Sequence, residues 1–251
     1  MSTSVIEARG ISLAFAGNQA LADVDLSLSQ SHWLGLIGPN GSGKSTMLNV
    51  LSGIYAPQGG TMTMDGSSLS RRPSRHRLRL GVARTFQHPQ LVASLTLTEN
   101  VMLGARALRV RRAQARDLAR ASLDRLGCAA FADLLPAEAP YGAQKMAEVA
   151  RAMVSRPRVL LLDEPAAGLG AADRRDLLSA LRACRQDDPD LAVCLIEHDV
   201  SLVAAVCDSL AVLSAGRLIA RGAVSDVLDD PVVQEAYLGS KSSTGEGRRR
   251  A

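Results

Sequence analysis

Lysine is almost missing from this basic chain, which carries 29 Lys and Arg residues and a net charge of +4. Aromatic residues make up only 3% of its 251 residues, which disfavours a nucleic-acid site that stacks bases on aromatic side chains. The three lysines are Lys44, Lys145 and Lys241. Lys44 and Lys145 both fall in loop-like segments, and for Lys44 this indicates a chemical role rather than chance.

The remaining positive charge is arginine, and two stretches are rich in it. They contain Arg71, Arg72, Arg75, Arg77 and Arg79, and then Arg106, Arg109, Arg111, Arg112, Arg116 and Arg120. A solvated helix face is the main interpretation of both stretches. Contact with an anionic membrane surface or an acidic partner is the alternative.

Three further absences narrow the class of protein. The four cysteines form no C-x-x-C pair and no metal spacing, so a reduced, cytosolic chain is expected. No apolar run approaches the roughly 18–20 residues that cross a bilayer. The first ten residues lack the basic start and apolar centre of a signal peptide. With 47% hydrophobic residues, the chain can bury a sizeable core as one domain, or as one domain with a large insertion.

Apolar patterning predicts an α/β organisation. Residues 3–37 contain short strand patterns ("SVIEA", "ISLAF", "VDLSLS") and end in the buried run "WLGLIG"; a helix over 44–52 and an edge strand in "GTMTMDG" follow. Residues 88–150 are helical in pattern, with Thr98 as the expected N-cap of the first helix. After residue 158, apolar strands alternate with helices, which predicts a parallel sheet covered on both faces. A helical subdomain therefore interrupts an α/β core, and the polar tail "GSKSSTGEGRRRA" is expected to be disordered.

The stretch "GPNGSGKST" carries the clearest chemistry. It matches G-x-x-x-x-G-K-[ST] and lies between a strand and a helix, as a phosphate-binding P-loop requires. Its glycines let backbone N–H groups point at phosphate oxygens, and the helix N-terminus adds partial positive charge. Lys44 would bridge the β- and γ-phosphates and the Ser45 hydroxyl would hold Mg²⁺. The nucleotide-binding residues expected here are Gly38, Pro39, Asn40, Gly41, Ser42, Gly43, Lys44, Ser45 and Thr46.

A second motif, "RVLLLDEP", reads as a buried strand that ends in two acids. Asp163 suits the shell of Mg²⁺, directly or through water. Glu164 could accept the proton of an attacking water. Together the two motifs predict nucleotide binding, while kinase, GTPase and transport ATPase activities all stay open at this point.

Three more segments, "ARTFQ", "APYGAQ" and "IEHD", follow in order around these motifs. With them, residues 5–239 resemble the ATP-binding subunit of ATP-binding-cassette (ABC) transporters. The resemblance implies that Gln87 lies near Mg²⁺ and the attacking water, and that His198 contacts the γ-phosphate. It also implies that Phe15, 29 residues before Lys44, stacks on adenine. ATP and Mg²⁺ are the cofactors expected, with Ser45, Gln87 and Asp163 at the metal.

The segment "APYGA" aligns with the family's Leu-Ser-Gly-Gly-Gln signature. The resemblance implies that this signature caps the γ-phosphate bound by a second ATP-binding subunit, through Tyr141, Gly142, Ala143 and Gln144. Two departures stand out. Pro140 replaces the family's serine, so a hydroxyl and a backbone donor are lost, and Gly170 stands where an aspartate is common. Both departures predict weaker contacts between the two subunits.

The implied organisation is an ABC ATPase unit over residues 4–239, with a P-loop NTPase core of mostly parallel sheet and an N-terminal antiparallel β-subdomain. The core and β part would occupy 4–87 and 155–239, the helical subdomain about 88–154, and a disordered tail 240–251. "DEPAAGL", "IEHDVSLV" and "DPVVQEAYLG" look like ATPases of branched-chain amino-acid importers or their relatives for other amino acids and amides.

Partners follow from the same resemblance. They are a second ATP-binding subunit, identical or different, two transmembrane permease subunits, and an extracytoplasmic substrate-binding protein that acts through the permeases, without nucleic acid. The chain itself is expected as a peripheral subunit at the cytoplasmic face of the inner or plasma membrane. The groove near Gln87 would receive a helix of a permease. A lipid or lipopolysaccharide export ATPase remains the alternative within the class. A non-transport ABC protein usually has two cassettes or a long coiled coil, and neither is found, while the complete set of catalytic motifs disfavours a non-hydrolysing module.

Overall fold

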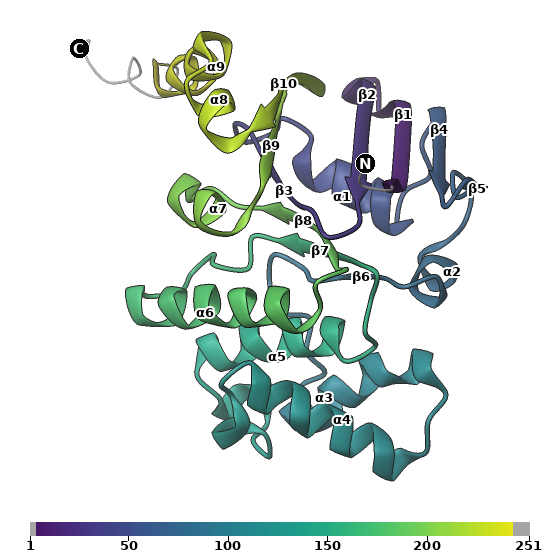
Figure 1. Cartoon of the computed structure of the whole chain (residues 1–251), viewed down its shortest axis with the longest axis vertical. Helices are drawn as coiled ribbons and strands as arrows, with labels where there is room; N and C mark the ends of the chain where they lie inside the picture. Colours follow the sequence, from purple (N-terminus) through teal and green to yellow (C-terminus); the bar gives the residue numbers. More distant parts are fainter. Residues whose placement is uncertain (1–3, 243–251) are drawn as a thin grey trace.

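The computed structural model describes residues 4–242, which form two β-sheets and a set of helices (Figure 1). The strands are β1 (Ser4–Phe15), β2 (Asn18–Ser29), β3 (Trp33–Ile37), β4 (Gly59–Met64), β5 (Ser67–Ser68), β6 (Val82–Arg84), β7 (Val159–Asp163), β8 (Ala192–Ile196), β9 (Ser209–Ser214) and β10 (Arg217–Ala223). The α-helices are α1 (Lys44–Ser52), α2 (Ser74–Arg79), α3 (Leu97–Gly104), α4 (Arg112–Arg125), α5 (Tyr141–Met153), α6 (Ala171–Asp187), α7 (Val200–Val206), α8 (Val224–Leu228) and α9 (Pro231–Ser242). Short 3₁₀ turns are η1 (Ala105–Leu108), η2 (Ala129–Phe131) and η3 (Pro136–Glu138).

The central sheet has the strand order β10-β9-β3-β8-β7-β6 and is parallel from β9 to β6. All residues of β3, β7 and β8 are buried, because both faces of the sheet are covered. One face packs against α1 and the antiparallel sheet, and the other against helices that include α5, α6 and α7 (Figure 1). The predicted α/β core with a mostly parallel sheet, an antiparallel β part and inserted helices is confirmed.

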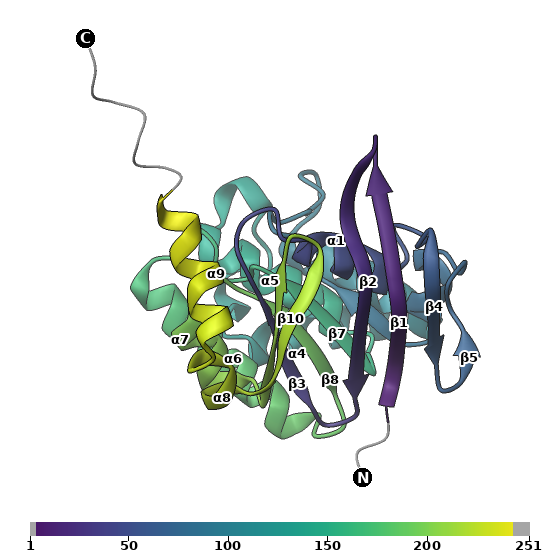
Figure 2. The same ribbon diagram turned by 90° about the horizontal axis from the view of Figure 1, so that it is seen from above.

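The antiparallel sheet has the order β2-β1-β4-β5, and its two long strands extend beyond the central sheet at one end (Figure 2). The prediction of separate short strands in "SVIEA" and "ISLAF" is wrong, because both belong to β1. Gly10, with φ of 62°, lies where the pairing with β2 shifts register, so the strand passes through a bulge instead of ending. Strand β4 was expected at the edge of its sheet, but it pairs with the short strand β5, which forms the edge instead.

Helices α3, α4 and α5 pack against one another. In the sequence they come between β6 and β7. Thr98 is not the N-cap of α3, contrary to prediction. Thr96 caps it, in a capping box with Glu99, because the hydroxyl of Thr98 is buried and donates to the carbonyl of Ala132 at 2.8 Å. No helix within residues 4–242 is both long and apolar enough to span a membrane.

The closing helix α9 starts at Pro231, where Asp230 accepts a hydrogen bond from the N–H of Val232. It continues to Ser242, so residues 240–242 of the tail predicted to be disordered are helical. Once a helix has formed, each further residue adds one backbone hydrogen bond, and this propagation outweighs the polar composition of the segment. Residues 243–251 lie outside the described residues.

All four cysteines are buried and free of disulfides, as their spacing predicts. Burial raises the pKa of the Cys128 thiol to about 12, of Cys184 to about 11 and of Cys207 to about 12. The thiol of Cys194 in β8 is fully enclosed in the core cluster that also contains α1 and the antiparallel sheet, and burial raises its pKa further. These thiols stay protonated at neutral pH.

One residue of the first arginine stretch is part of the core. Arg77 is 1% exposed, and its guanidinium donates to the carbonyls of Val50 and Leu51 at the end of α1, at 2.5 and 2.8 Å. It also donates to the carbonyls of Leu69 and Arg72. Burial lowers its pKa to about 10. Arg77 therefore caps the C-terminus of α1 from inside the protein, and the solvated-face interpretation does not hold for this residue.

We predict that Arg77→Met lowers the free energy of unfolding by roughly 2–4 kcal/mol, because several backbone carbonyls lose a hydrogen bond inside the protein. Urea denaturation followed by circular dichroism measures this loss. Arg79→Met in the same helix is the matched control: Arg79 is exposed, and the expected change is within about 0.5 kcal/mol. Equal stability of the two variants would contradict the capping role.

Candidate functional site

The predicted P-loop lies between the end of β3 and the start of α1. Gly43 is the N-cap of α1 with φ of 105°, and a Cβ there would lie 2.6 Å from the carbonyl oxygen of Ala20 in β2. At Gly38 a Cβ would lie 2.0 Å from the carbonyl oxygen of Leu213 in β9. The loop is thus wedged between two strands, and only glycine fits at these two positions.

Two buried groups of this loop are suited to an anion. The ammonium of Lys44, 5% exposed, donates to the carbonyls of Gly38 and Pro39 at 2.8 and 2.9 Å. Burial lowers its pKa, and the carboxylates of Glu164 and Asp163 oppose that shift. The Ser42 hydroxyl, in a residue 3% exposed, has no hydrogen-bond partner among the described residues. An orphaned donor beside a buried cation fits a phosphate group.

The three residues predicted to be catalytic meet at one carboxylate. Glu164 follows β7 with φ of 47°, a left-handed conformation that is costly for glutamate, and it is 7% exposed. Its two oxygens receive hydrogen bonds from Gln87 Nε2 at 2.8 Å and His198 Nε2 at 2.9 Å. All three line one pocket with loop residues 40–46. Segments distant in sequence therefore converge, because they follow neighbouring parallel strands.

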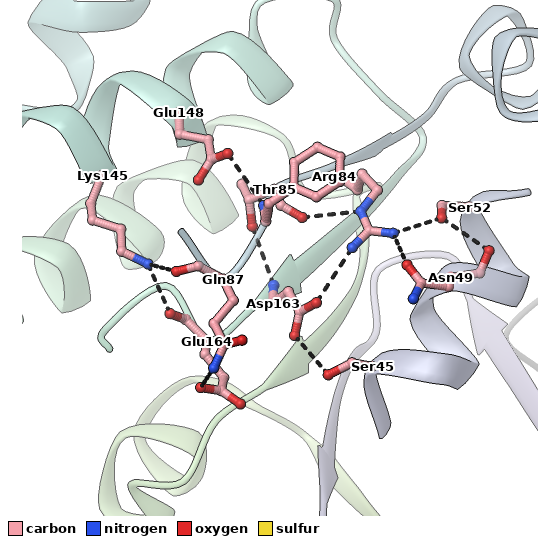
Figure 3. Close-up of polar contacts among 11 residues, drawn as sticks. Ser45, Asn49, Ser52, Arg84, Thr85, Gln87, Lys145, Glu148, Asp163 and Glu164 are labelled. Carbon is pink, nitrogen blue, oxygen red and sulfur yellow. Dashed lines mark hydrogen bonds and ion pairs between the residues drawn. The ribbon is translucent and has the colours of Figure 1, made fainter. Parts of the chain in front are cut away.

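Of the three predicted metal ligands, Ser45 and Asp163 lie close together and Gln87 is engaged elsewhere (Figure 3). Ser45 Oγ lies 3.4 Å from Asp163 Oδ1. Neighbouring ligands of an octahedral Mg²⁺ lie about 3 Å apart, given bonds of about 2.1 Å, so this hydroxyl and carboxylate fit the ion together with phosphate and water oxygens. Gln87 differs, because its amide nitrogen is bonded to Glu164. Burial raises the pKa of Asp163, and the Arg84 guanidinium offsets part of the rise.

Arg84 belongs to this site, although the sequence assigned it no role. Its guanidinium lies 3.4 Å from Asp163 Oδ2 and donates to Asn49 Oδ1 and Ser52 Oγ of α1 at 2.6 and 3.0 Å (Figure 3). It also lies 4.4 Å from the ring centre of Phe86. Arg84 thus joins the acidic end of β7 to the helix that follows the P-loop. In the sequence, only its position within the segment "ARTFQ" pointed to a place at this site.

Glu197 was also missed. It is 5% exposed, and its carboxylate accepts the N–H of Ala166 at 2.6 Å and the N–H of His198 at 3.3 Å. Burial raises its pKa, and these two backbone donors lower it in part. Glu197 therefore links, by hydrogen bonds, the turn after Glu164 to His198, which is itself hydrogen-bonded to Glu164.

The other predicted nucleotide contacts lie outside this pocket. Phe15, at the end of β1, is 42% exposed and packs edge-on against Tyr55, with ring centres 5.1 Å apart. This exposure excludes a position in the hydrophobic core for Phe15. The segment from Tyr141 to Gln144 forms the first turn of α5, which has Pro140 as N-cap and no side-chain cap. Its first N–H groups are left for another acceptor.

Comparison with known proteins identifies this arrangement. Residues 21–167 match the model of the ABC transporter family. The chain belongs to the ABC transporter family. Residues 217–242 match a second model, described as a branched-chain amino acid ATP-binding cassette transporter. As a member of this family, the chain is an ABC ATPase that binds nucleotide.

Two curated relatives align along nearly their whole length. The high-affinity branched-chain amino acid transport ATP-binding proteins BraF of Pseudomonas aeruginosa and LivG of Escherichia coli are each 35% identical to this ABC ATPase, over 95% of this chain and 99% of theirs. Among solved structures, the ADP conformation of MJ1267, an ATP-binding cassette of an ABC transporter, superposes with a TM-score of 0.83 at 26% identity. The match covers 95% of this chain and all of MJ1267.

We predict that Ser42→Ala weakens ATP binding without destabilising the chain. The unpartnered hydroxyl costs roughly 1–3 kcal/mol in the nucleotide-free chain, so its loss leaves stability unchanged or raised by about 1 kcal/mol. The dissociation constant for ATP should rise about tenfold, since a phosphate donor is lost. Thermal unfolding and fluorescent-nucleotide titration measure the two effects. Ser52→Ala, which removes an acceptor for Arg84, should instead destabilise the chain; unchanged ATP affinity in Ser42→Ala would contradict the assignment.

Proposed function

We propose that this ABC ATPase is the energy-supplying subunit of an importer for branched-chain amino acids or a related amino acid or amide. The names of the two curated relatives and the match of residues 217–242 support this substrate class. ATP hydrolysis drives the transport. We place the subunit at the cytoplasmic face of the membrane, bound to permease subunits rather than inserted in the bilayer.

Within one chain, residues of the P-loop bind and orient the nucleotide. Lys44 and the backbone N–H groups of the loop would donate to phosphate oxygens, and Phe15 would stack on the adenine from the end of β1. Ser45 and Asp163 would hold Mg²⁺, which neutralises phosphate charge when bound. Arg84 keeps the Asp163 carboxylate aimed at Ser45, at the separations given above.

Glu164 is the proposed general base. Its carboxylate would take the proton of the attacking water, a contribution of about 10²–10⁴-fold in rate. Gln87 and His198 donate to its two oxygens and so fix the direction in which those oxygens point. When nucleotide is present, the same two side chains would be free to turn toward the water and the γ-phosphate. The convergence of Gln87 and His198 on the two carboxylate oxygens of Glu164 is the observation that carries this mechanism.

A second ATP-binding subunit is needed to complete each site. The signature turn at Tyr141 does not line the pocket of its own P-loop, and its uncapped N–H groups suit phosphate oxygens brought by another subunit. We propose a head-to-tail pair in which ATP binding closes two such sites. Pro140 and Gly170 weaken this pair relative to family members with serine and aspartate there, as the sequence predicts.

We predict that Glu164→Gln protein forms a dimer with ATP but not with ADP, because hydrolysis is slowed about 10²–10⁴-fold while binding persists. Size exclusion with light scattering, at several protein concentrations, measures this. The variant that also carries Lys44→Ala is the control and should stay monomeric. A chain that binds ATP and remains monomeric even at high concentration would argue against a homodimer and for a different ATPase as partner.

The docking surface proposed for the permease is a cleft between the core and the inserted helices. We propose that residues 88–154 form the helical subdomain and the flanking residues the core. The cleft is lined mainly by apolar side chains and has arginines but no acidic residue among its described lining. Its lining includes Ile54, Arg75, Leu78, Phe86, Gln90, Leu103 and Arg151. An amphipathic permease helix that presents apolar side chains and an acid fits this surface.

We predict that Leu78→Arg reduces copurification of the ATPase with its two permease subunits at least tenfold, since it adds charge to an apolar contact that is 40% exposed. ATP hydrolysis by the isolated ATPase should stay within twofold of wild type. Leu108→Arg is the matched control, because Leu108 is 37% exposed and does not line the cleft. Equal assembly of both variants would place the permease elsewhere.

A further inference from the structure

The signature helix α5 carries a row of three charged residues, Lys145, Glu148 and Arg151, spaced by three positions. This spacing places them on one side of the helix. Lys145 and Glu148 are each 1% exposed. Buried charges of this kind rarely add stability over apolar residues of similar size, so their presence calls for another reason.

All three side chains hold the backbone of residues 86–90. Glu148 Oε1 accepts the N–H groups of Phe86 and Gln90 at 3.3 and 3.2 Å. Arg151 donates to the carbonyl of Gln90 at 2.5 Å. Lys145 Nζ donates to the carbonyl of Gln87 at 2.5 Å. The segment that carries Gln87 is therefore attached to α5 at several points.

Lys145 reaches further than the other two residues of the row. Its ammonium also donates to the backbone carbonyl of Glu164 at 3.2 Å (Figure 3). Gln87 Nε2 also donates a hydrogen bond to the side chain of Glu164. Gln87 and Glu164 are therefore connected twice, once directly and once through the ammonium of Lys145. The same ammonium lies 5.9 Å from the ring centre of Tyr141, in the first turn of α5.

We propose that Lys145 is a positioning residue that fixes Glu164 and Gln87 relative to the signature turn. Glu164 has a left-handed backbone that the surrounding structure must maintain, and Lys145 bonds the carbonyl of that same residue. A displacement of the signature turn would move the lysine and with it the carboxylate. The inference rests on the proposed role of Glu164 as general base.

The test compares the full-length wild-type chain with Lys145→Met, which keeps the apolar stem and removes the donor. Its kcat for ATP hydrolysis should fall about 10–100-fold while KM for ATP stays within about threefold, because the P-loop is untouched. Affinity for ATP in the absence of Mg²⁺, measured by fluorescent-nucleotide titration, should be unchanged. Arg120→Met is the control, since the exposed Arg120 of α4 pairs with the exposed Asp133 instead, and its kcat should stay within about threefold of wild type.

A second comparison shows whether Lys145 acts through Glu164. In a Glu164→Gln background, Lys145→Met should lower the residual hydrolysis less than twofold, because the group that it positions is already gone. A further tenfold loss would overturn the proposal, as would a wild-type kcat in Lys145→Met. A parallel loss of kcat and of metal-free ATP affinity would also overturn it and indicate a merely structural role.

If Lys145→Met does not fold, Lys145→Gln is measured against the same criteria. Absence of hydrolysis in the wild-type chain together with intact ATP binding would contradict the proposed function itself. That result is distinct from a loss of hydrolysis caused by the substitution of Lys145.

Discussion

The parallel order of β3, β8, β7 and β6 is the constraint on which the site depends. Because the carboxyl ends of parallel strands meet at one edge of a sheet, each strand delivers its following residues to the same place. The P-loop follows β3, the two acids end and follow β7, and Glu197 with His198 follows β8. Gln87 comes shortly after β6. Four segments far apart in the chain are thus brought together without long loops.

Around this edge lies a layer of buried charge that is almost fully paired. Arg84, Lys145, Glu148 and Glu197 each bond backbone or side-chain groups of the segments that leave the strands. A buried charge is tolerated when its hydrogen bonds are satisfied, and such groups then fix one geometry. The hydroxyl of Ser42, which has no partner among the residues that the structure describes, lies in the loop itself, where we propose that phosphate binds. The charged side chains around the site are therefore held by hydrogen bonds, while the loop itself keeps a hydroxyl that can still form one.

The sequence predicts much of this arrangement, because local motifs carry it. The P-loop, the acids after β7, Gln87 and His198 could be located by their order, and the bounds of α1 match the prediction. The N-cap of α3 could not be located from the sequence, since Thr96 and Thr98 are equally suitable until the contact of Thr98 with Ala132 is known. The roles of Arg84 and Lys145 were equally hidden, because burial of a long cationic side chain depends on segments distant in sequence. The catalytic assignments themselves stay predictions.

The burial of all four cysteines has a practical consequence. Native thiols that are enclosed and protonated react slowly with maleimides, since the thiolate is the nucleophile. A cysteine introduced at an exposed position would therefore be labelled selectively without first removing the natural ones. Two such labels, one on the inserted helices and one on the antiparallel sheet, would make the relative motion of these two parts visible by single-molecule fluorescence.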